Sequence, residues 1–297
     1  MRIFVTGATG FVGSAVVQEL IGAGHQVLGL TRSDEGAAAL TSAGAEVHHG
    51  SLGDLASLRA GADMVDGIIH TAFDHDFSRF AENCELDQLV IQAFGDALKG
   101  SDRPLIVTSG LSLVMAGNVG TEQDIAVPAS DAYPRASEAA TSALAASGIN
   151  ASVVRLPPSV HGLGDHGFVP TLINIAREKG VSAYIGDGDN VWPAVHRLDA
   201  ARVFRLAVEN GTANGPFHAV AEQGVPFKAI AEVISHRLDI PVASKTAEEA
   251  EEHFGWFAFF AAMNVPTSSS QTRALLDWEP TQQGLIVDID QPNYFAC

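Results

Sequence analysis

Residues 2–13 read Arg-Ile-Phe-Val-Thr-Gly-Ala-Thr-Gly-Phe-Val-Gly, and this stretch decides the fold. Residues 2–6 are rich in apolar and β-branched residues and predict a buried strand, and residues 11–22 carry apolar side chains at helical spacing. Between strand and helix stand Gly7, Gly10 and Gly13. Glycines allow a tight turn and a close backbone approach, and a helix N-terminus attracts negative charge. The order of strand, turn and helix therefore predicts a site for the pyrophosphate of a dinucleotide.

Strands and helical stretches alternate through the first half of the chain. Further strands are predicted at residues 26–30, 45–48, 67–72, 104–108 and 151–155, and helices at 36–43, 77–99 and 136–147. Alternation of this kind is typical of a parallel sheet with helices on both faces. We therefore expect an α/β fold with a doubly wound parallel sheet.

After residue 155 the pattern changes, because glycine and proline become frequent and loops dominate. Helices are predicted at residues 199–210, 226–238, 246–263 and 268–276, and a strand at 216–220. We expect a first domain at 1–155 and a smaller C-terminal α+β region at 156–297, interleaved with the last elements of the first domain.

Composition limits the function classes. The chain has 297 residues, 46% of them hydrophobic, and 17 basic against 35 acidic residues give a net charge of −18. Such a charge opposes binding to nucleic acids and to anionic membrane surfaces. Two cysteines are too few for a disulfide framework, and no run approaches the roughly 18 apolar residues that span a bilayer. We expect a cytoplasmic protein without signal peptide or membrane anchor.

The end of the second strand bears on the choice of nucleotide. Leu30 is followed by Thr31, Arg32 and Ser33, so the acidic residue that would bind the ribose 2′-hydroxyl of NAD is absent. An arginine suits a 2′-phosphate through charge-assisted hydrogen bonds. We therefore expect NADP (NADPH) in preference to NAD.

Further motifs carry a family resemblance. They are HTAF at 70–73, TSG at 108–110, Tyr133 before a helix, RLPPSVHGLGD at 155–165 and VHRLDAARVFRLAVE at 195–209. Together with the glycine turn, the chain resembles the extended or atypical short-chain dehydrogenases/reductases of the NAD-dependent epimerase/dehydratase family. The resemblance implies a Rossmann sheet, a C-terminal substrate region and a nicotinamide ring near Tyr133.

The resemblance also implies which residues line the cofactor. They belong to the glycine turn, the ends of the second and third strands, the stretch after the fourth strand, and the stretch after the sixth. The residues are Gly7, Thr9, Gly10, Phe11, Val12, Gly13, Arg32, Ser51, Leu52, Thr71, Ala72, Phe73, Pro158, Ser159 and Val160. Ser51 departs from the acidic residue common in the family, but its hydroxyl can still form a hydrogen bond.

The catalytic positions carry two departures from the family. Tyr133 matches the proton donor, but Ser137 stands where the family has the lysine that lowers the pKa of the tyrosine. Arg135 would face away from Tyr133 in a continuous helix, and replaces the lysine only if the helix begins later. The serine that orients the carbonyl is either Ser109 or Ser112, because glycine interrupts the usual run of hydroxyls.

Other sources of the missing positive charge stay open. The oxidised nicotinamide ring would supply one, and so would His161, Arg155 or His196. Neither the acidic and histidine residues at 74–76 nor those at 161–166 match a metal-ligand spacing, so no metal is expected.

These features favour an NADP(H)-dependent oxidoreductase that transfers hydride between nicotinamide and a carbonyl or alcohol. An aromatic-rich segment at 254–263 suggests an apolar cover, and hence a small, hydrophobic substrate. The alternatives are an epimerase or dehydratase with tightly held cofactor, and a catalytically idle NADP-binding sensor. A homodimer is a further expectation from the resemblance.

Overall fold

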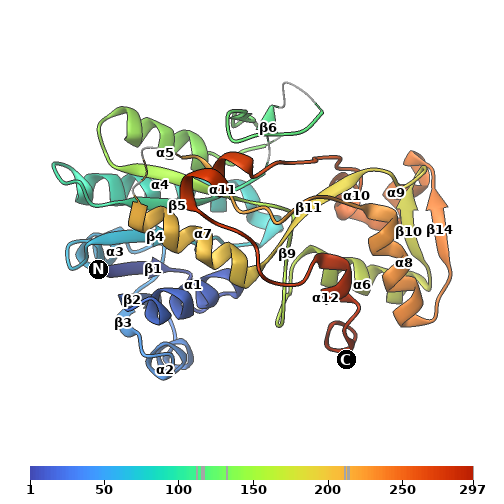
Figure 1. Ribbon diagram of the computed structural model, residues 1–297, viewed down its shortest axis with the longest axis horizontal. Helices are drawn as coiled ribbons and strands as arrows, with labels where there is room; N and C mark the ends of the chain where they lie inside the picture. Colours follow the sequence, from blue (N-terminus) through green and yellow to red (C-terminus); the bar gives the residue numbers. More distant parts are fainter. Residues whose placement is uncertain (112, 115–117, 132, 211, 213–214, 297) are drawn as a thin grey trace.

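The computed structural model describes residues 1–111, 113–114, 118–131, 133–210, 212 and 215–296. Its centre is a seven-stranded sheet in the order β12-β8-β5-β4-β1-β2-β3, in which every neighbouring pair is parallel (Figure 1). The strands are β1 (Arg2–Thr6), β2 (Gln26–Thr31), β3 (Glu46–His49), β4 (Gly67–His70), β5 (Leu105–Gly110), β8 (Ala151–Leu156) and β12 (Phe217–His218). The predicted doubly wound Rossmann sheet is confirmed.

Helices cover both faces of this sheet. They are α1 (Phe11–Gly22), α2 (Asp34–Ser42), α3 (Leu55–Ala62), α4 (Phe80–Leu98), α5 (Ser137–Ala146) and α7 (Arg197–Asn210). In β1, Ile3 and Val5 pack with residues of α1 and α7, whereas Phe4 packs with residues of α3, α4 and α5. Because successive strand residues point to opposite faces, a continuous apolar run such as Ile-Phe-Val fits a strand buried on both sides.

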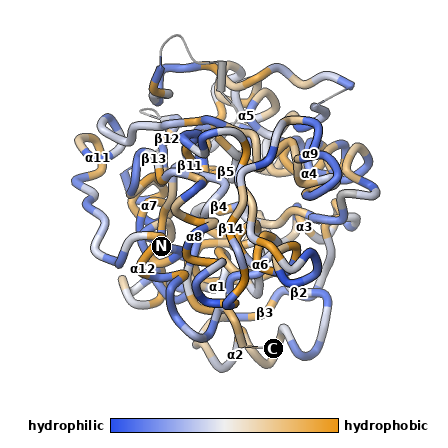
Figure 2. The backbone as a smooth tube through the Cα atoms, turned by 90° about the vertical axis from the view of Figure 1, so that its right-hand side faces the viewer, coloured by the Kyte–Doolittle hydropathy of each residue, from blue (hydrophilic) through white to orange (hydrophobic). Residues whose placement is uncertain are grey.

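A second group of elements packs around its own apolar core, at the right of Figure 1. Its helices are α6 (Phe168–Lys179), α8 (Phe227–Leu238), α9 (Ala247–Phe254), α10 (Ala258–Ala261) and α12 (Leu285–Ile289). Its strands are β9 (Ser159–His161), β10 (Ser182–Ile185), β11 (Val191–His196), β13 (Glu222–Pro226) and β14 (Val242–Lys245). Figure 2 faces this region and shows hydrophilic and hydrophobic residues mixed along α6 and α8, as expected of helices buried on one side.

The remaining elements are short. They are β6 (Leu113–Val114), β7 (Ile125–Ala126), α11 (Ser270–Leu276), and the 3₁₀ turns η1 (Phe77–Arg79), η2 (Gly255–Phe257) and η3 (Pro292–Tyr294). The chain passes from the main sheet to the second group and back. Strand β9 belongs to the second group, whereas α7 and β12, which follow it in sequence, belong to the main sheet and its helices. The boundary at residues 155 and 156 stays a prediction.

Short or interrupted elements depart most from expectation. Helices α3 and α6 are not among the predicted elements, and the chain forms α9, η2 and α10 where one helical stretch is predicted over 246–263. The break falls at Gly255, whose φ of +55° leaves the helical region. Among the described residues, no helix is both long and apolar enough to cross a bilayer.

Candidate cofactor and substrate site

The glycine turn joins β1 to α1 with no room for larger side chains. Gly7 has a φ of +66°, and its carbonyl accepts a hydrogen bond of 2.9 Å from the Gly10 N–H. A Cβ on Gly7 would lie 2.7 Å from the Ala72 nitrogen, and a Cβ on Gly13 would overlap the Gly7 carbonyl. Both positions therefore require glycine, which brings backbone close to the segment after β4.

The start of α1 is open to an anion. Gly10 is the N-cap residue and offers no side chain to the N–H groups of the first turn, which include those of Phe11 and Val12. Uncapped N–H groups and the helix dipole together favour a phosphate. Thr9 and Gly10 are exposed at this point, so the turn is accessible from solvent.

The stretch after β4 lies against the same turn. The Thr71 hydroxyl donates to the Thr6 carbonyl at 2.7 Å, and the Ala72 N–H donates to the Thr6 hydroxyl at 3.4 Å. Thr71, Ala72 and Phe73 are partly buried there. The fold thus brings two of the predicted cofactor segments together.

At the other end of the cofactor site, Arg32 directly follows β2, the strand beside β1. Its side chain is exposed and makes no hydrogen bond or ion pair with any residue that the structure describes. Ser51 is exposed and Leu52 is half-buried, just beyond β3. These residues lie at the carboxyl ends of neighbouring strands, where doubly wound sheets bind their ligands.

The stretch after β8 forms β9. Ser159 is buried with no hydrogen-bond partner for its Oγ in the described part of the chain, whereas Pro158 and Val160 are half-buried. β9 runs parallel to β11, with Val160 opposite Val195. Arg197, the first residue after β11, lies beside the glycine turn, with its guanidinium 5.2 Å from the centre of the Phe11 ring.

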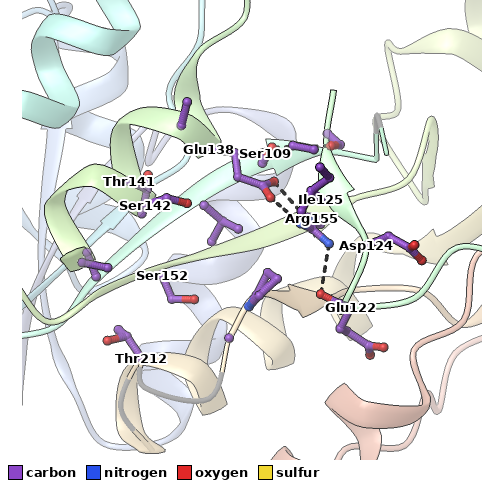
Figure 3. A pocket seen from close by; sticks show the side chains of 18 of the residues that line it. Ser109, Glu122, Asp124, Ile125, Glu138, Thr141, Ser142, Ser152, Arg155 and Thr212 are labelled. Atoms are coloured by element: carbon purple, nitrogen blue, oxygen red, sulfur yellow. Dashed lines mark hydrogen bonds and ion pairs between the residues drawn. The ribbon is translucent and has the colours of Figure 1, made fainter. Parts of the chain in front are cut away.

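Ser109 and Tyr133 line one cavity of about 860 Å³, which Figure 3 shows from close by. Its walls are the end of β5, helix α5 along its length, strand β8 with the residues before it at 148–150, and the loop at residues 122–129, together with Asp102, Thr212 and residues 215–216. Ser109 is buried, and its hydroxyl donates a 3.4 Å hydrogen bond to the Gly110 carbonyl. Ser112, the other predicted hydroxyl, lies outside the described residues.

Helix α5 begins at Ser137, after Tyr133. Tyr133 belongs to a tight turn, in which its N–H donates to the Ser130 carbonyl at 3.0 Å. Because α5 starts after Arg135, the argument that Arg135 faces away from Tyr133 in a continuous helix does not apply. Arg135 lines the same cavity as Tyr133. Its guanidinium lies 4.2 Å from the centre of the Phe73 ring.

Ser137, at the position of the family's lysine, belongs to a buried chain of polar groups. Its hydroxyl donates to Asp87 Oδ2 at 2.5 Å, and Asp87 Oδ1 accepts from His70 Nε2 at 3.0 Å. His70 Nδ1 lies 2.6 Å from the Thr6 hydroxyl. Burial alone would raise the pKa of Asp87, but His70, Arg135 and the Ser137 hydroxyl together lower it.

A second polar cluster surrounds Arg155. The guanidinium donates from Nε and Nη2 to Glu138, a pair visible in Figure 3, and from Nη1 to His218 Nε2 at 3.0 Å. His218 Nδ1 donates to the Ser268 carbonyl at 2.7 Å, so Nε2 is the acceptor and the ring is neutral. Burial lowers the pKa of His218 accordingly. Arg155 is thus committed to protein partners.

His161 and His196, the two histidines considered as sources of the missing positive charge, also contact other protein groups. His161 is buried, with Nδ1 2.8 Å from Asp288 Oδ2, and its ring meets that of His196 edge to face. Burial and the His161 charge lower the pKa of His196. The Tyr294 hydroxyl donates to the same Asp288 oxygen at 2.9 Å.

Two further expectations meet the structure here. Within the described chain no group of three His, Cys, Asp or Glu side chains is arranged to hold a metal ion. Of the aromatic segment, Phe254 and Phe257 are buried in the second core, whereas Trp256 and Phe259 are 59% and 70% exposed. None of these four lines the cavity, so the idea of an aromatic cover finds no support in the cavity walls.

Sequence reasoning missed Asp87, Asp288 and Tyr294. Asp87 occupies a buried position of α4, where an acidic residue among apolar neighbours is a signal visible in the sequence. Asp288 and Tyr294 have no local signal, because their partners His161 and Gly162 are more than a hundred residues away along the chain.

The doubly wound sheet, the glycine turn and the open start of α1 define a Rossmann fold, a class in which dinucleotides bind at this turn. The profile of the NAD-dependent epimerase/dehydratase family matches residues 3–220, and the chain belongs to this family. An uncharacterized protein of Schizosaccharomyces pombe is 52% identical over 99% of this chain and 100% of its own length.

Two other proteins are more distantly similar. The decarboxylating sterol-4-alpha-carboxylate 3-dehydrogenase of Dictyostelium discoideum is 26% identical, over 76% of this chain and 73% of its own. The solved structure of a double mutant of the dTDP-glucose 4,6-dehydratase DesIV of Streptomyces venezuelae, with NAD and DAU bound, has a TM-score of 0.76 at 19% identity. The match covers 99% of this chain and 97% of that one. This likeness concerns the fold.

Proposed function

We propose that the protein is an NADP(H)-dependent oxidoreductase that acts on a carbonyl or alcohol. The observation that carries the proposal is the shared cavity of Ser109 and Tyr133, two hydroxyl groups 24 positions apart in sequence. Ser109 belongs to the end of strand β5 and Tyr133 precedes α5, so the two hydroxyls come from different segments of the chain.

The residues present fit a nicotinamide dinucleotide. Gly7 and Gly13 leave space that a Cβ would fill, and the uncapped start of α1 is placed for a pyrophosphate. The segment Thr71–Phe73 would line the cofactor, and Arg32 would take the 2′-phosphate that distinguishes NADP from NAD. When bound, the nicotinamide supplies or accepts the hydride.

The chain's own residues would manage the proton and the oxygen. Tyr133 would donate its hydroxyl proton to the substrate oxygen during reduction and take it back during oxidation. Ser109 would donate a hydrogen bond to the same oxygen and hold it beside Tyr133. Ser137 cannot act as the family's lysine does, because its hydroxyl is committed to Asp87.

Membership of the family and the name of the sterol dehydrogenase support dehydrogenase chemistry. The likeness to a dTDP-glucose dehydratase supports a second candidate, an epimerase or dehydratase that keeps its cofactor. The third candidate is an NADP-binding sensor without turnover, and it is favoured because the Ser137 hydroxyl is already bound to Asp87. A homodimer, a cytoplasmic location and a hydrophobic substrate stay predictions.

The first experiment is a fluorescence titration of the purified protein with NADPH and with NADH. We expect NADPH to bind at least about tenfold more tightly, and Arg32→Ala to remove the difference, because a charge-assisted contact to a phosphate is worth on the order of 1.4 kcal/mol or more. Arg59→Ala, at an exposed arginine of α3, is the control. Equal affinity for both nucleotides would refute the NADP preference, and no binding would refute all three candidates.

The second experiment tests the proton donor on a panel of aldehydes and ketones with NADPH. We expect Tyr133→Phe to lower kcat/KM by about a hundredfold or more for any compound that the native protein reduces. An effect below about threefold would show that Tyr133 is not the acid. Binding of NADPH without reduction of any compound would favour the sensor, and nucleotide retained through purification would favour the epimerase or dehydratase.

A further inference from the structure

Two arginines line the cavity, and they differ in what their side chains bind. Arg155 directs its guanidinium nitrogens to Glu138, His218 and the Glu122 carbonyl. Arg135 uses only its Nε, which donates to the Ser137 hydroxyl at 3.1 Å. In the described part of the chain, Arg135 Nη1 and Nη2 have no hydrogen-bond partner and form no ion pair.

The guanidinium of Arg135 is held from two sides. Its Nε is anchored on Ser137, which is 1% exposed and itself bound to Asp87. Its plane lies over Phe73 at 4.2 Å. Because the group is fixed before a ligand arrives, little conformational entropy is lost when the two terminal nitrogens bind one.

The charges on the cavity walls are unevenly distributed. Glu122 and Asp124 belong to the loop at residues 122–129. Figure 3 places them on the far side of Arg155 from Thr141 and Ser142. Glu138 is neutralised by Arg155. An anion would therefore be repelled by the loop side and attracted to Arg135, while the apolar side chains at 125–128 would contact an uncharged part of the ligand.

We propose that Arg135 is the anion-recognition residue of this cavity, and that its ligand carries a carboxylate. A carboxylate matches the planar fork of the guanidinium with two parallel hydrogen bonds. This inference rests on the proposed function, since it defines the substrate as a carbonyl or alcohol compound that also bears a carboxylate. Ser137 and Asp87 are positioning residues for Arg135.

The test compares sodium benzoate with benzamide, which has the same ring and no charge. Both are titrated into the full-length protein saturated with NADP⁺, at constant ionic strength, with the ¹⁵N–¹H resonance of Arg135 Nε as the readout. We expect benzoate to bind at least about tenfold more tightly than benzamide, because only the anion forms a charge-assisted pair. Arg135→Gln should abolish the difference, and Arg135→Lys should keep part of it.

Matched variants distinguish the positioning of Arg135 from effects on the stability of the fold. Ser137→Ala should reduce the preference for benzoate severalfold, because it releases Nε. Ser147→Ala, at the other end of α5, and Arg59→Ala should leave the preference unchanged. Variants that alter nothing except stability leave the ratio of the two affinities constant, so this ratio reports the anion contact itself.

Three results would overturn the inference. The first is equal affinity for benzoate and benzamide. The second is a preference that persists in Arg135→Gln, which would place the anion elsewhere, as at the open start of α1. The third is an unchanged preference with a shifted pH profile of carbonyl reduction, which would assign Arg135 to Tyr133 instead. If no nucleotide binds, the proposed function fails, and the same titration without nucleotide still decides the role of Arg135.

Discussion

Two buried histidine and aspartate pairs use the same chemistry for different ends. His70 and Asp87 join β4 to α4 at 3.0 Å, and His161 and Asp288 join β9 to α12 at 2.8 Å. Both carboxylates have a pKa held below the usual value by their hydrogen bonds and histidines, although burial opposes this.

The difference lies in what the second oxygen binds. In the first pair, Asp87 reaches Ser137 and through it Arg135 at the cavity. In the second pair, Asp288 binds Gln283, from the same C-terminal segment. The first pair orients a charged group of the candidate site, whereas the second fastens the end of the chain to the loop after β9. A buried histidine–aspartate contact thus says little about function until its remaining partners are known.

The largest effect should come from Asp87→Ala. Removing one member of a buried pair leaves the other unsatisfied, and we expect the free energy of unfolding to fall by about 3–5 kcal/mol, measured by urea denaturation. Asp96→Ala, on the same helix but in an exposed pair with Arg59, should cost about 1 kcal/mol or less. Equal losses in the two variants would show that burial of the first pair contributes nothing.

Asp288→Ala should have a smaller and more local effect. It removes the shared partner of His161, Gln283 and Tyr294, and we expect a loss of about 2–3 kcal/mol, confined to the C-terminal segment. Amide hydrogen exchange should speed up at Gly162, whose N–H donates to the Tyr294 hydroxyl. Asp290→Ala, in an exposed pair, is the control. Uniformly faster exchange over the main sheet would contradict a local role.

Asp165, next to the second pair, gives a pH dependence. Burial raises its pKa from 3.8 to about 6, so the folded state holds this proton more tightly than the unfolded chain does. Its contribution to stability is therefore lost as the pH rises from about 4 to about 6.

Asp165→Asn keeps an acceptor for the Gly167 N–H and has no charge to bury. Relative to the native protein, the variant should gain on the order of 1–2 kcal/mol at pH 7 compared with pH 4, after allowance for partial exposure. Denaturation at both pH values measures the gain. A variant whose stability parallels that of the native protein across this range would argue against the raised pKa.

The smallest effect should come from Tyr294→Phe. The ring stays, but the hydroxyl loses its bonds with Gly162 and Asp288, and we expect a loss of about 1 kcal/mol in the free energy of unfolding. Tyr184→Phe, whose hydroxyl has no hydrogen bond in the described chain, is the control and should be neutral. A loss as large as that of Asp288→Ala would mean that the hydroxyl holds the segment in place by itself.

Local patterns allowed much of the fold to be predicted. The bounds of β1 and α1 agree with the predicted ones to the residue, because apolar strand, glycine turn and helical spacing are all read within the first 22 positions. Helices α3 and α6 were not predicted, because their patterns are short or lie among loop residues. The role of Arg135 could not be decided from the sequence, because its position relative to Tyr133 depends on where α5 begins.

By itself, then, the sequence determined the class of fold and the glycine turn, because strand, turn and helix follow one another within the first 22 residues. Only the tertiary structure decided which groups serve the cavity. Ser109 and Tyr133 line one cavity from different segments of the chain, and Asp87, on another helix, accepts a hydrogen bond from Ser137. The hydrogen bond from Ser137 to Asp87 joins residues 50 positions apart, and no spacing along the chain encodes such a contact.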